Sequence, residues 1–278
     1  MKDFLQNHGI EHFAAVPLER CKILKEYLLT TNGFNIQNYA ITMLIPYRTE
    51  LSPTNLSVYA SVADYHAFIN QLSRDLDTYV KKKYPQGRFK LFADHSPIDE
   101  VHAACISGLG FIGDNGLLIN EVYSSFVFLA ECITNLNPKQ IGIKPSQISN
   151  VTECIHCGAC ALACPSGCIK KPGGVDDLKS KTACLSAITQ KKGELCDDEI
   201  KMMLENNTVW GCDICQNACP YTKQAKYSSI DFFKKGAICT LTTQDIINMS
   251  EEEFSSHPFS WRGRQTILRN LKLYEEKR

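Results

Sequence analysis

The segment that decides the fold reads Cys154-Ile-His-Cys157-Gly-Ala-Cys160-Ala-Leu-Ala-Cys164-Pro165. Its spacing, C-x2-C-x2-C-x3-C-P, is the run that binds a [4Fe–4S] cluster in bacterial ferredoxins. Three thiolates on one tight loop can bind three irons of the cube, whereas the fourth cysteine of such a run ligates the other cluster of a pair. A zinc site would instead need two C-x2-C pairs further apart. The segment therefore predicts iron–sulfur chemistry and a second cluster.

A shorter run provides cysteines for that second cluster. It reads Cys212-x2-Cys215-x3-Cys219-Pro220, with Val209 where a complete copy would carry another cysteine. Two cubes need eight thiolates, and the two runs supply four and three. The missing one must come from elsewhere, and the candidates are Cys168, Cys184 and Cys196. We choose Cys184 before Cys168, because Cys168 follows Cys164 by only four residues in a Pro-Ser-Gly turn.

Exchange of the fourth cysteine between the two runs divides the ligands into two sets. The first set is Cys154, Cys157, Cys160 and Cys219. The second set is Cys164, Cys184, Cys212 and Cys215. The other cysteines are expected to be small buried hydrophobic residues, namely Cys21, Cys105, Cys132, Cys168, Cys196 and Cys239.

Length and composition set the broad class. The chain has 278 residues, of which 44% are hydrophobic and 22% charged, with 30 basic and 30 acidic side chains. These values are typical of a globular enzyme and exclude a disordered chain or a disulfide miniprotein. The first residues show no signal peptide, and no apolar stretch approaches the ~20 residues of a membrane span. We expect a cytoplasmic protein without a membrane partner, in which 14 cysteines serve as metal ligands more than as disulfides.

The distribution of cysteines predicts the domain organisation, because ten of the 14 lie between Cys154 and Cys219. We expect an α+β protein with an N-terminal α/β domain over residues 1–150, a ferredoxin-like double-cluster domain over 151–225, and a C-terminal helical segment over 226–278 that packs on the core. Apolar patterning predicts strands at 39–46, 90–93, 117–120 and 125–131, and a loop at 108–116. It predicts helices at 19–29, 64–79, 243–249 and 265–276, and another that begins at Ser96 and Pro97 and ends near 106.

Further segments carry a family resemblance. They are Ala63-Asp-Tyr-His66, Asp94-His-Ser-Pro97, Gly108-Leu-Gly-Phe-Ile-Gly113, Cys184-Leu-Ser-Ala-Ile-Thr, Trp210-Gly-Cys-Asp-Ile-Cys-Gln-Asn-Ala-Cys-Pro220 and Trp261-Arg-Gly-Arg. In order and spacing, over about residues 39–271, they resemble the epoxyqueuosine reductase family. The cluster runs alone are shared by many redox proteins, so the Asp-x-x-Pro and glycine segments make the resemblance specific.

The resemblance implies a cobalamin enzyme with two [4Fe–4S] clusters and an N-terminal α/β sandwich of the cobalamin-binding type. Such an enzyme reduces the epoxide of epoxyqueuosine in a tRNA anticodon to the alkene of queuosine, using an external low-potential donor such as ferredoxin or flavodoxin. The family's general acid matches Asp94, and its remote cluster ligand matches Cys184. The chain would be a short, divergent member without the C-terminal helical-repeat extension.

The glycine segment and a nearby histidine are the candidates for holding the cofactor. Gly108, Gly110 and Gly113 match the letters of a dinucleotide fingerprint. They follow a predicted helix and lead into a strand, which is not the context of a nicotinamide site. We expect them to let the backbone approach a large planar ligand such as a corrin. His66 is the second cofactor-binding candidate.

Asp94 must hold a proton at neutral pH if it is the general acid. A free aspartate is ionised there, so the role requires a carboxyl shielded from water. We expect Phe92, Ala93 and the glycine segment to provide that shielding.

Two alternatives to the main hypothesis remain. The chain could be an electron-transfer protein without a corrin, or a corrinoid reductase that acts on a different small electrophile.

Contact with tRNA phosphates is predicted from basic residues, namely Lys81, Lys82, Lys83, Arg262, Arg264 and Arg269.

Overall fold

In the computed structural model of the chain, residues 1–143, 153–170 and 183–277 are described, so the boundary predicted at residue 150 lies outside the described part. The chain divides into two compact units, each made of separate stretches. The first unit comprises Met1–Pro46, His66–Ile155 and Gln224–Ile230. The second comprises Tyr47–Tyr65, His156–Lys223 and Asp231–Arg278.

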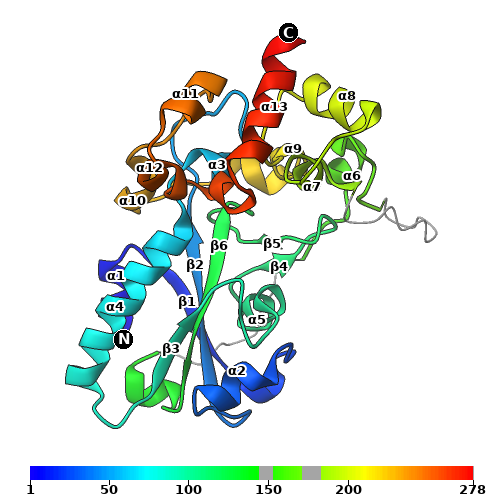
Figure 1. Cartoon of the computed structure of the whole chain (residues 1–278). Coiled ribbons are helices and arrows are strands. Elements are labelled where there is room, and N and C mark those ends of the chain that lie inside the picture. The colour runs from blue at the N-terminus through cyan, green and yellow to red at the C-terminus, as the bar shows by residue number, and fades with distance from the viewer. Residues whose placement is uncertain (144–152, 171–182, 278) are drawn as a thin grey trace. The chain divides into compact units, whose positions relative to one another are not determined.

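The first unit is built on a four-stranded antiparallel sheet (Figure 1). Its strands, in spatial order, are β1 (His12–Pro17), β2 (Tyr39–Pro46), β6 (Val127–Thr134) and β3 (Phe89–Phe92). The predicted strands at 39–46, 90–93 and 125–131 are confirmed, because β2, β3 and β6 occupy them to within a few residues. Every residue of β2 after Tyr39 is buried, as expected for a central strand covered on both faces.

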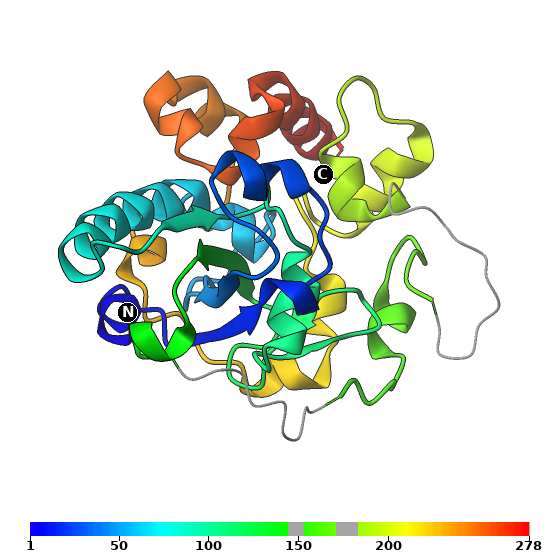
Figure 2. The same ribbon diagram turned by 90° about the horizontal axis from the view of Figure 1, so that it is seen from below.

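Helices cover both faces of this sheet (Figures 1 and 2). On one side lie α1 (Lys2–Asn7) and α4 (Tyr65–Lys83), and on the other α5 (Glu100–Ile106). The first side packs Leu72 and Leu76 of α4 around Met43 and Cys132. The second packs Ala104 of α5 into a cluster with residues of β2 and β6. The predicted α/β architecture of the N-terminal region is therefore confirmed.

Two predicted elements of the first unit are corrected. The loop predicted at 108–116 contains β4 (Phe111–Ile112), which pairs with β5 (Leu118–Ile119), because Asn115-Gly116 turns the chain back into a hairpin. The helix predicted at 19–29 is shorter. A 3-10 turn covers Leu18–Arg20, and α2 covers only Glu26–Thr31, because Ile23 between them forms a β-bridge to Ile98.

The start of α5 is also different from the prediction. The helix begins at Glu100, and its N-cap is Asp99, whose carboxylate accepts a hydrogen bond from the His102 N–H at 3.1 Å. Ser96 does not cap the helix, because its hydroxyl donates to the Glu131 carboxyl on β6. This difference places an acidic side chain of the sheet beside the segment that holds Asp94.

The second unit consists of short helices. They are α3 (Val58–Ser61), α6 (Ala159–Ala163), α7 (Leu185–Thr189), α8 (Asp197–Glu205), α9 (Ile214–Asn217), α10 (Asp231–Lys234), α11 (Thr243–Asn248), α12 (Glu251–Ser255) and α13 (Arg264–Glu276). The helices predicted at 243–249 and 265–276 are confirmed as α11 and α13. They pack around Trp210 and Phe259, both fully buried. Buried Asn270 on α13 donates to the carbonyls of Thr189 and Val209 at 2.7 and 2.8 Å, so its amide is satisfied inside this core.

Among the described helices, none combines the length and the hydropathy needed to cross a membrane.

Candidate functional site

Asp94 lies in a tight turn that follows β3 directly. Its φ of +60° is in the left-handed region, where few residues other than glycine lie but aspartate is tolerated. The His95 N–H donates to the Ala93 carbonyl at 2.6 Å and closes the turn. The Asp94 N–H donates to Glu100 Oε1 at 3.1 Å. The backbone therefore turns sharply at the residue predicted to be the acid.

The turn brings Asp94 next to the other predicted residue, His66. Asp94 Oδ2 lies 3.2 Å from His66 Nε2 at the start of α4, although 28 positions separate the two in the sequence. The side chains are 64% and 52% exposed, respectively. The prediction that Phe92, Ala93 and the glycine segment shield Asp94 from water is wrong for the chain without a ligand. The turn carries the Asp94 carboxyl away from buried Phe92 and toward solvent.

A buried carboxyl pair, which no motif in the sequence indicated, lies behind this turn. Glu131 in β6 is 1% exposed and is hydrogen-bonded to Glu100, the first residue of α5. Burial, followed by the charge of Glu100, raises the pKa of Glu131 well above its ordinary value. Burial likewise raises the pKa of Glu100 to about 7. The sequence signal was an acidic residue inside the apolar strand 127–134.

Two of the predicted cofactor glycines pack against the protein itself. A side chain at Gly110 would collide with the Ile119 carbonyl of β5. One at Gly113 would meet Ile119 Cδ1 at 2.6 Å. Gly108 has a φ of +78° at the end of the α5 region, where a residue with a side chain would be strained. Packing against Ile119 thus accounts for the lack of a side chain at Gly110 and Gly113, and their contact with a corrin stays a prediction.

The structure gathers the thiols of the second predicted set. Burial first, and then nearby thiols, raise the pKa of Cys215 to about 12, and those thiols belong to Cys212, Cys184 and Cys164. Burial also raises the pKa of Cys212 to about 12, and Cys184 and Cys164 contribute in the same direction. Cys212 and Cys215, with the thiols of Cys164 and Cys184 beside them, form a donor set suited to a cationic iron cluster, which stabilises thiolates. The residues present fit a [4Fe–4S] cluster.

Cys168, the other candidate for the missing ligand, has a different position. Its sulfur lies 3.5 Å from that of Cys164. Burial, partly opposed by Ser166, raises the pKa of Cys168, and the nearby Cys164 and Cys184 add to this rise. Cys184 raises the pKa of both Cys212 and Cys215, whereas Cys168 is hydrogen-bonded to Cys164. These neighbourhoods favour Cys184, and the assignment stays a prediction.

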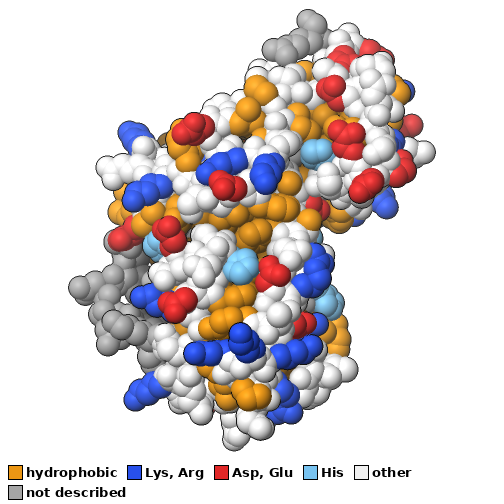
Figure 3. Space-filling view, turned by 90° about the vertical axis from the view of Figure 1, so that its left-hand side faces the viewer, with side chains coloured by type: hydrophobic (Ala, Val, Ile, Leu, Met, Phe, Trp, Pro, Cys, Tyr) orange, Lys and Arg blue, Asp and Glu red, His pale blue; other side chains and the backbone are white. Residues whose placement is uncertain are grey.

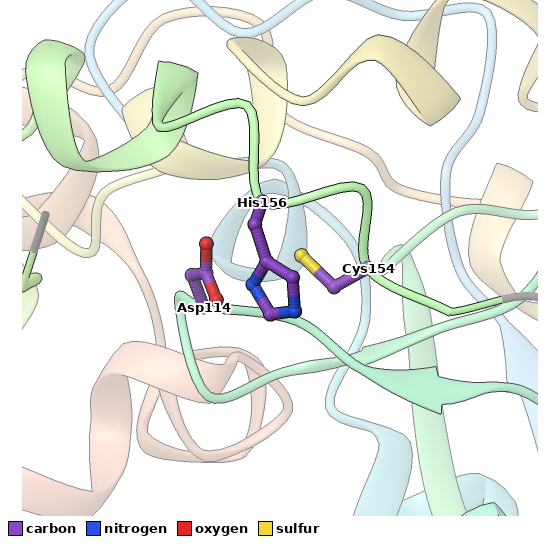
Figure 4. Close-up of side chains that lie close together, drawn as sticks. All are labelled: Asp114, Cys154 and His156. Carbon is purple, nitrogen blue, oxygen red and sulfur yellow. The ribbon is translucent and has the colours of Figure 1, made fainter. Parts of the chain in front are cut away.

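The cysteines of the first set are distributed over both units. Cys157, Cys160 and Cys219 belong to the second unit, in which α6, carrying Cys160, packs on α9. Cys154 belongs to the first unit, where its sulfur lies within 4.8 Å of an Asp114 carboxylate oxygen (Figure 4). This first set also stays a prediction.

The remaining cysteines only partly match the expectation that they are buried. Cys21 and Cys132 are buried, and Cys105 and Cys168 are half-buried. Cys196 and Cys239 are exposed, so the expectation is wrong for them. Cys196 is the N-cap of α8, a position at the protein surface.

Two of the basic residues predicted to contact phosphates are engaged within the protein. Arg264 donates to Glu251 at 2.7 Å, and Arg269 donates to the Lys191 carbonyl at 2.7 Å. The three lysines 81–83 lie in the last turn of α4. On the face that α1 and α4 cover, Lys and Arg side chains gather in the lower part of the view (Figure 3). The lysines are therefore better placed than these two arginines to contact an anionic partner.

Comparison with protein families identifies the cluster-binding region. Residues 153–222 match the family described as a 4Fe-4S double cluster binding domain. The chain therefore contains an iron–sulfur domain for two clusters, as the cysteine spacing predicted.

Comparison with individual proteins extends the similarity to the rest of the chain. An epoxyqueuosine reductase from Leadbetterella byssophila is 32% identical over 226 residues, which cover 79% of this chain and 69% of that protein. One from Listeria monocytogenes is 30% identical over 212 residues, covering 74% of this chain. The aligned part spans about half, 53%, of the Listeria protein. A crystal structure of epoxyqueuosine reductase with a tRNA-Tyr epoxyqueuosine-modified tRNA stem loop matches with a TM-score of 0.73 at 23% identity, covering 98% of this chain and 79% of that one.

Proposed function

Because the chain belongs to the epoxyqueuosine reductase family, we propose that it reduces the epoxide of epoxyqueuosine in a tRNA anticodon to the alkene of queuosine. The names of its relatives support this proposal, as does the fold it shares with an enzyme crystallised with a modified stem loop. The reaction consumes two electrons and two protons, and the epoxide oxygen leaves as water. The protein must therefore deliver electrons and place an acid at that oxygen.

The observation that carries the proposal is the pairing of Asp94 with His66 at 3.2 Å. A carboxyl and an imidazole at this distance can hold a proton between them. Both side chains are exposed, so a substrate can reach them. In this proposal the bound substrate covers the exposed Asp94 side chain and shields it from water, so that the carboxyl holds a proton and donates it to the epoxide oxygen. His66 holds the carboxyl in place and returns a proton to it. General acid catalysis of this kind accelerates a reaction by roughly 10²–10⁴-fold.

Electrons would reach the site through the two clusters of the domain at residues 153–222. We assign one cluster to Cys154, Cys157, Cys160 and Cys219, and the other to Cys164, Cys184, Cys212 and Cys215. We place the boundaries of the cluster-binding domain at 151 and 225. The gathered thiols of the second set support this assignment. The donor would be an external low-potential protein of the ferredoxin or flavodoxin kind.

Cobalamin is the further cofactor that we propose, on the family relationship alone, and it would supply the reducing metal centre. Gly110 and Gly113 do not support it, because they pack on Ile119. Of the residues predicted to bind it, His66 is exposed and accessible to a ligand.

The test is reduction of an epoxyqueuosine-containing anticodon stem-loop by anaerobically reconstituted protein, with cobalamin and a strong reductant, followed by nucleoside mass spectrometry. Asp94→Asn should lower turnover by roughly 10²–10⁴-fold with the clusters retained. The matched control is Asp75→Asn, because Asp75 forms a similar surface pair with His8 at 3.3 Å elsewhere in the first unit. This control should leave turnover unchanged.

Two results would contradict the proposal. Equal turnover of Asp94→Asn and the wild type would show that the proton comes from another group. No queuosine from fully loaded wild-type protein would favour the alternatives, a corrinoid reductase for another electrophile or an electron-transfer protein. Corrin bands in the visible spectrum of the reconstituted protein would separate these two.

A further inference from the structure

The turn that carries Asp94 has an unfavourable backbone conformation that its surroundings must maintain. Asp94 has a φ of +60° at the centre of a three-residue turn closed between Ala93 and His95. A non-glycine residue in such a turn is strained, and the conformation persists only when neighbouring contacts hold it. The contacts that hold this turn therefore decide where the Asp94 carboxylate lies.

Two acidic side chains hold the turn, one at each end. Glu100 accepts the hydrogen bond from the Asp94 N–H at 3.1 Å. Glu131 accepts one from the Ser96 hydroxyl. The Ser96 oxygen in turn accepts from the Ile98 N–H at 3.1 Å, so the exit from the turn is also fixed. We call Glu100 and Glu131 the carboxyl clamp.

The carboxyl clamp is itself anchored in the fold. Glu131 belongs to β6, where it pairs with Thr42 of β2 on one side and Phe92 of β3 on the other. Glu100 is the first residue of α5, whose start is fixed by the Asp99 cap. The clamp thus connects the Asp94 turn to two rigid elements of the first unit.

The two acids of the clamp are hydrogen-bonded to each other, which requires a proton between them. Burial raises the pKa of both, so the proton stays bound near neutral pH. Among the charged groups near the pair, Asp94 adds to the rise in pKa at both acids, and Lys25 lowers the pKa of Glu100. The titratable thiols of Cys21 and Cys132 also lie near Glu131. A protonated pair with one negative charge can accept from the Asp94 N–H and remain buried.

We propose that Glu100 and Glu131 are positioning residues for Asp94, which hold its turn so that the carboxylate stays beside His66. Neither acid contacts the substrate in this proposal. The inference rests on the proposed role of Asp94 as general acid, because positioning matters for turnover only if Asp94 donates the proton. The contact between Glu100 and the Asp94 N–H is nevertheless measurable without any reaction.

Hydrogen exchange of the Asp94 amide tests the contact directly in the reconstituted protein. Glu100→Ala removes the acceptor, and a hydrogen bond to a charged acceptor is strong enough that the Asp94 amide should exchange about tenfold faster or more. Glu100→Gln should restore slow exchange, because its side-chain oxygen still accepts. Glu26→Ala, an exposed acid on α2, is the control and should leave the exchange rate unchanged. Unchanged exchange in Glu100→Ala would overturn the proposal.

A second variant guards against a general loss of structure in Glu100→Ala. Ser96→Ala leaves the carboxyl clamp intact but removes the hydrogen bond between Glu131 and the end of the turn. It should also accelerate exchange of the Asp94 amide while amides of β2 stay protected. Protection of the Asp94 amide equal to that of the wild type would overturn the part of the proposal that concerns Glu131.

Turnover of the stem-loop substrate then tests the consequence for catalysis. Misplacement of an acid by about 1 Å can cost roughly 10²-fold, so Glu100→Ala should lower kcat about tenfold to hundredfold with KM little changed. Glu100→Gln should keep kcat within about twofold of the wild type, which a proton-donating role of Glu100 would not allow. Fast exchange with normal kcat in Glu100→Ala would overturn the positioning role. If the wild type itself has no reductase activity, the proposed function fails, whereas the exchange results still decide whether the clamp holds the turn.

Discussion

Raising the pH from 5 to 8 should destabilise the first unit through the carboxyl clamp. Burial raises the pKa of Glu100 from 4.5 to about 7, so the folded protein binds a proton that the unfolded chain releases. The stabilisation is fully present below about 4.5 and is lost as the pH rises through about 7. At about 1.4 kcal/mol per pH unit, a rise of the Glu100 pKa from 4.5 to about 7 corresponds to a loss of roughly 2–3 kcal/mol between pH 5 and 8. Glu131, whose pKa is raised further, adds a loss of the same sign.

The double variant Glu100→Gln/Glu131→Gln isolates this effect, because the amides preserve the shape of the pair but do not titrate in this range. A loss of roughly 2–3 kcal/mol corresponds to a fall in Tm of roughly 4–12 °C for a domain of this size. The Tm of each holoprotein is measured at pH 5 and at pH 8 by circular dichroism, at one scan rate and under anaerobic conditions. Between these two pH values, the Tm of the wild type should fall further than the Tm of the double variant, and the difference should be at least this amount. Glu26→Gln, an exposed acid of α2, should behave like the wild type. Parallel Tm curves for the wild type and the double variant would refute the argument, because they would show that the pair is ionised throughout.

Further predictions concern the clusters, the glycine segment and the RNA. Cys184→Ala should hold four irons per chain and Cys168→Ala eight, as measured by iron and acid-labile sulfide analysis after anaerobic reconstitution; the reverse result would reassign the ligand. Gly110→Ala should lower the Tm without changing the iron content, because its side chain would collide with the Ile119 carbonyl; an unchanged Tm would contradict the packing described here. Binding of the anticodon stem-loop should weaken as salt rises, because phosphate contacts release counterions. Neutralising the three lysines 81–83 should flatten that dependence in a fluorescence anisotropy titration, and an unaltered salt slope would place the RNA elsewhere.

The parts of the fold that the sequence predicted well have strong local signals. The apolar run at 39–46 is long and β-branched, and it forms β2 with the bounds expected. The cysteine spacing identified the double-cluster domain because each run lies within a dozen residues. The helix start predicted at Ser96 was wrong, because a tertiary hydrogen bond to Glu131 competes with local capping.

The candidate site was less accessible to sequence reasoning, because it is assembled from distant residues. Asp94 and His66 were both named as candidates, but nothing in the spacing predicted their ion pair. Glu131 looked like one acid among apolar neighbours, and only the sheet register places it against Glu100 and the turn. The glycines were given a ligand-binding role, whereas the hairpin partner Ile119 accounts for two of them.

The division of each unit into separate stretches has a consequence for how the protein folds during synthesis. The chain passes from one unit to the other five times, and Gln224–Ile230 still belongs to the first. The core around Trp210 joins Leu56 to Leu271 and Tyr274, which are made more than 200 residues later. Contacts of such high sequence separation form slowly, and the second unit cannot complete this core on the ribosome before residues 267–274 emerge. The nascent chain therefore exposes the apolar surface of the second unit and its cluster thiols until those residues are made, and stable cluster insertion should follow that point.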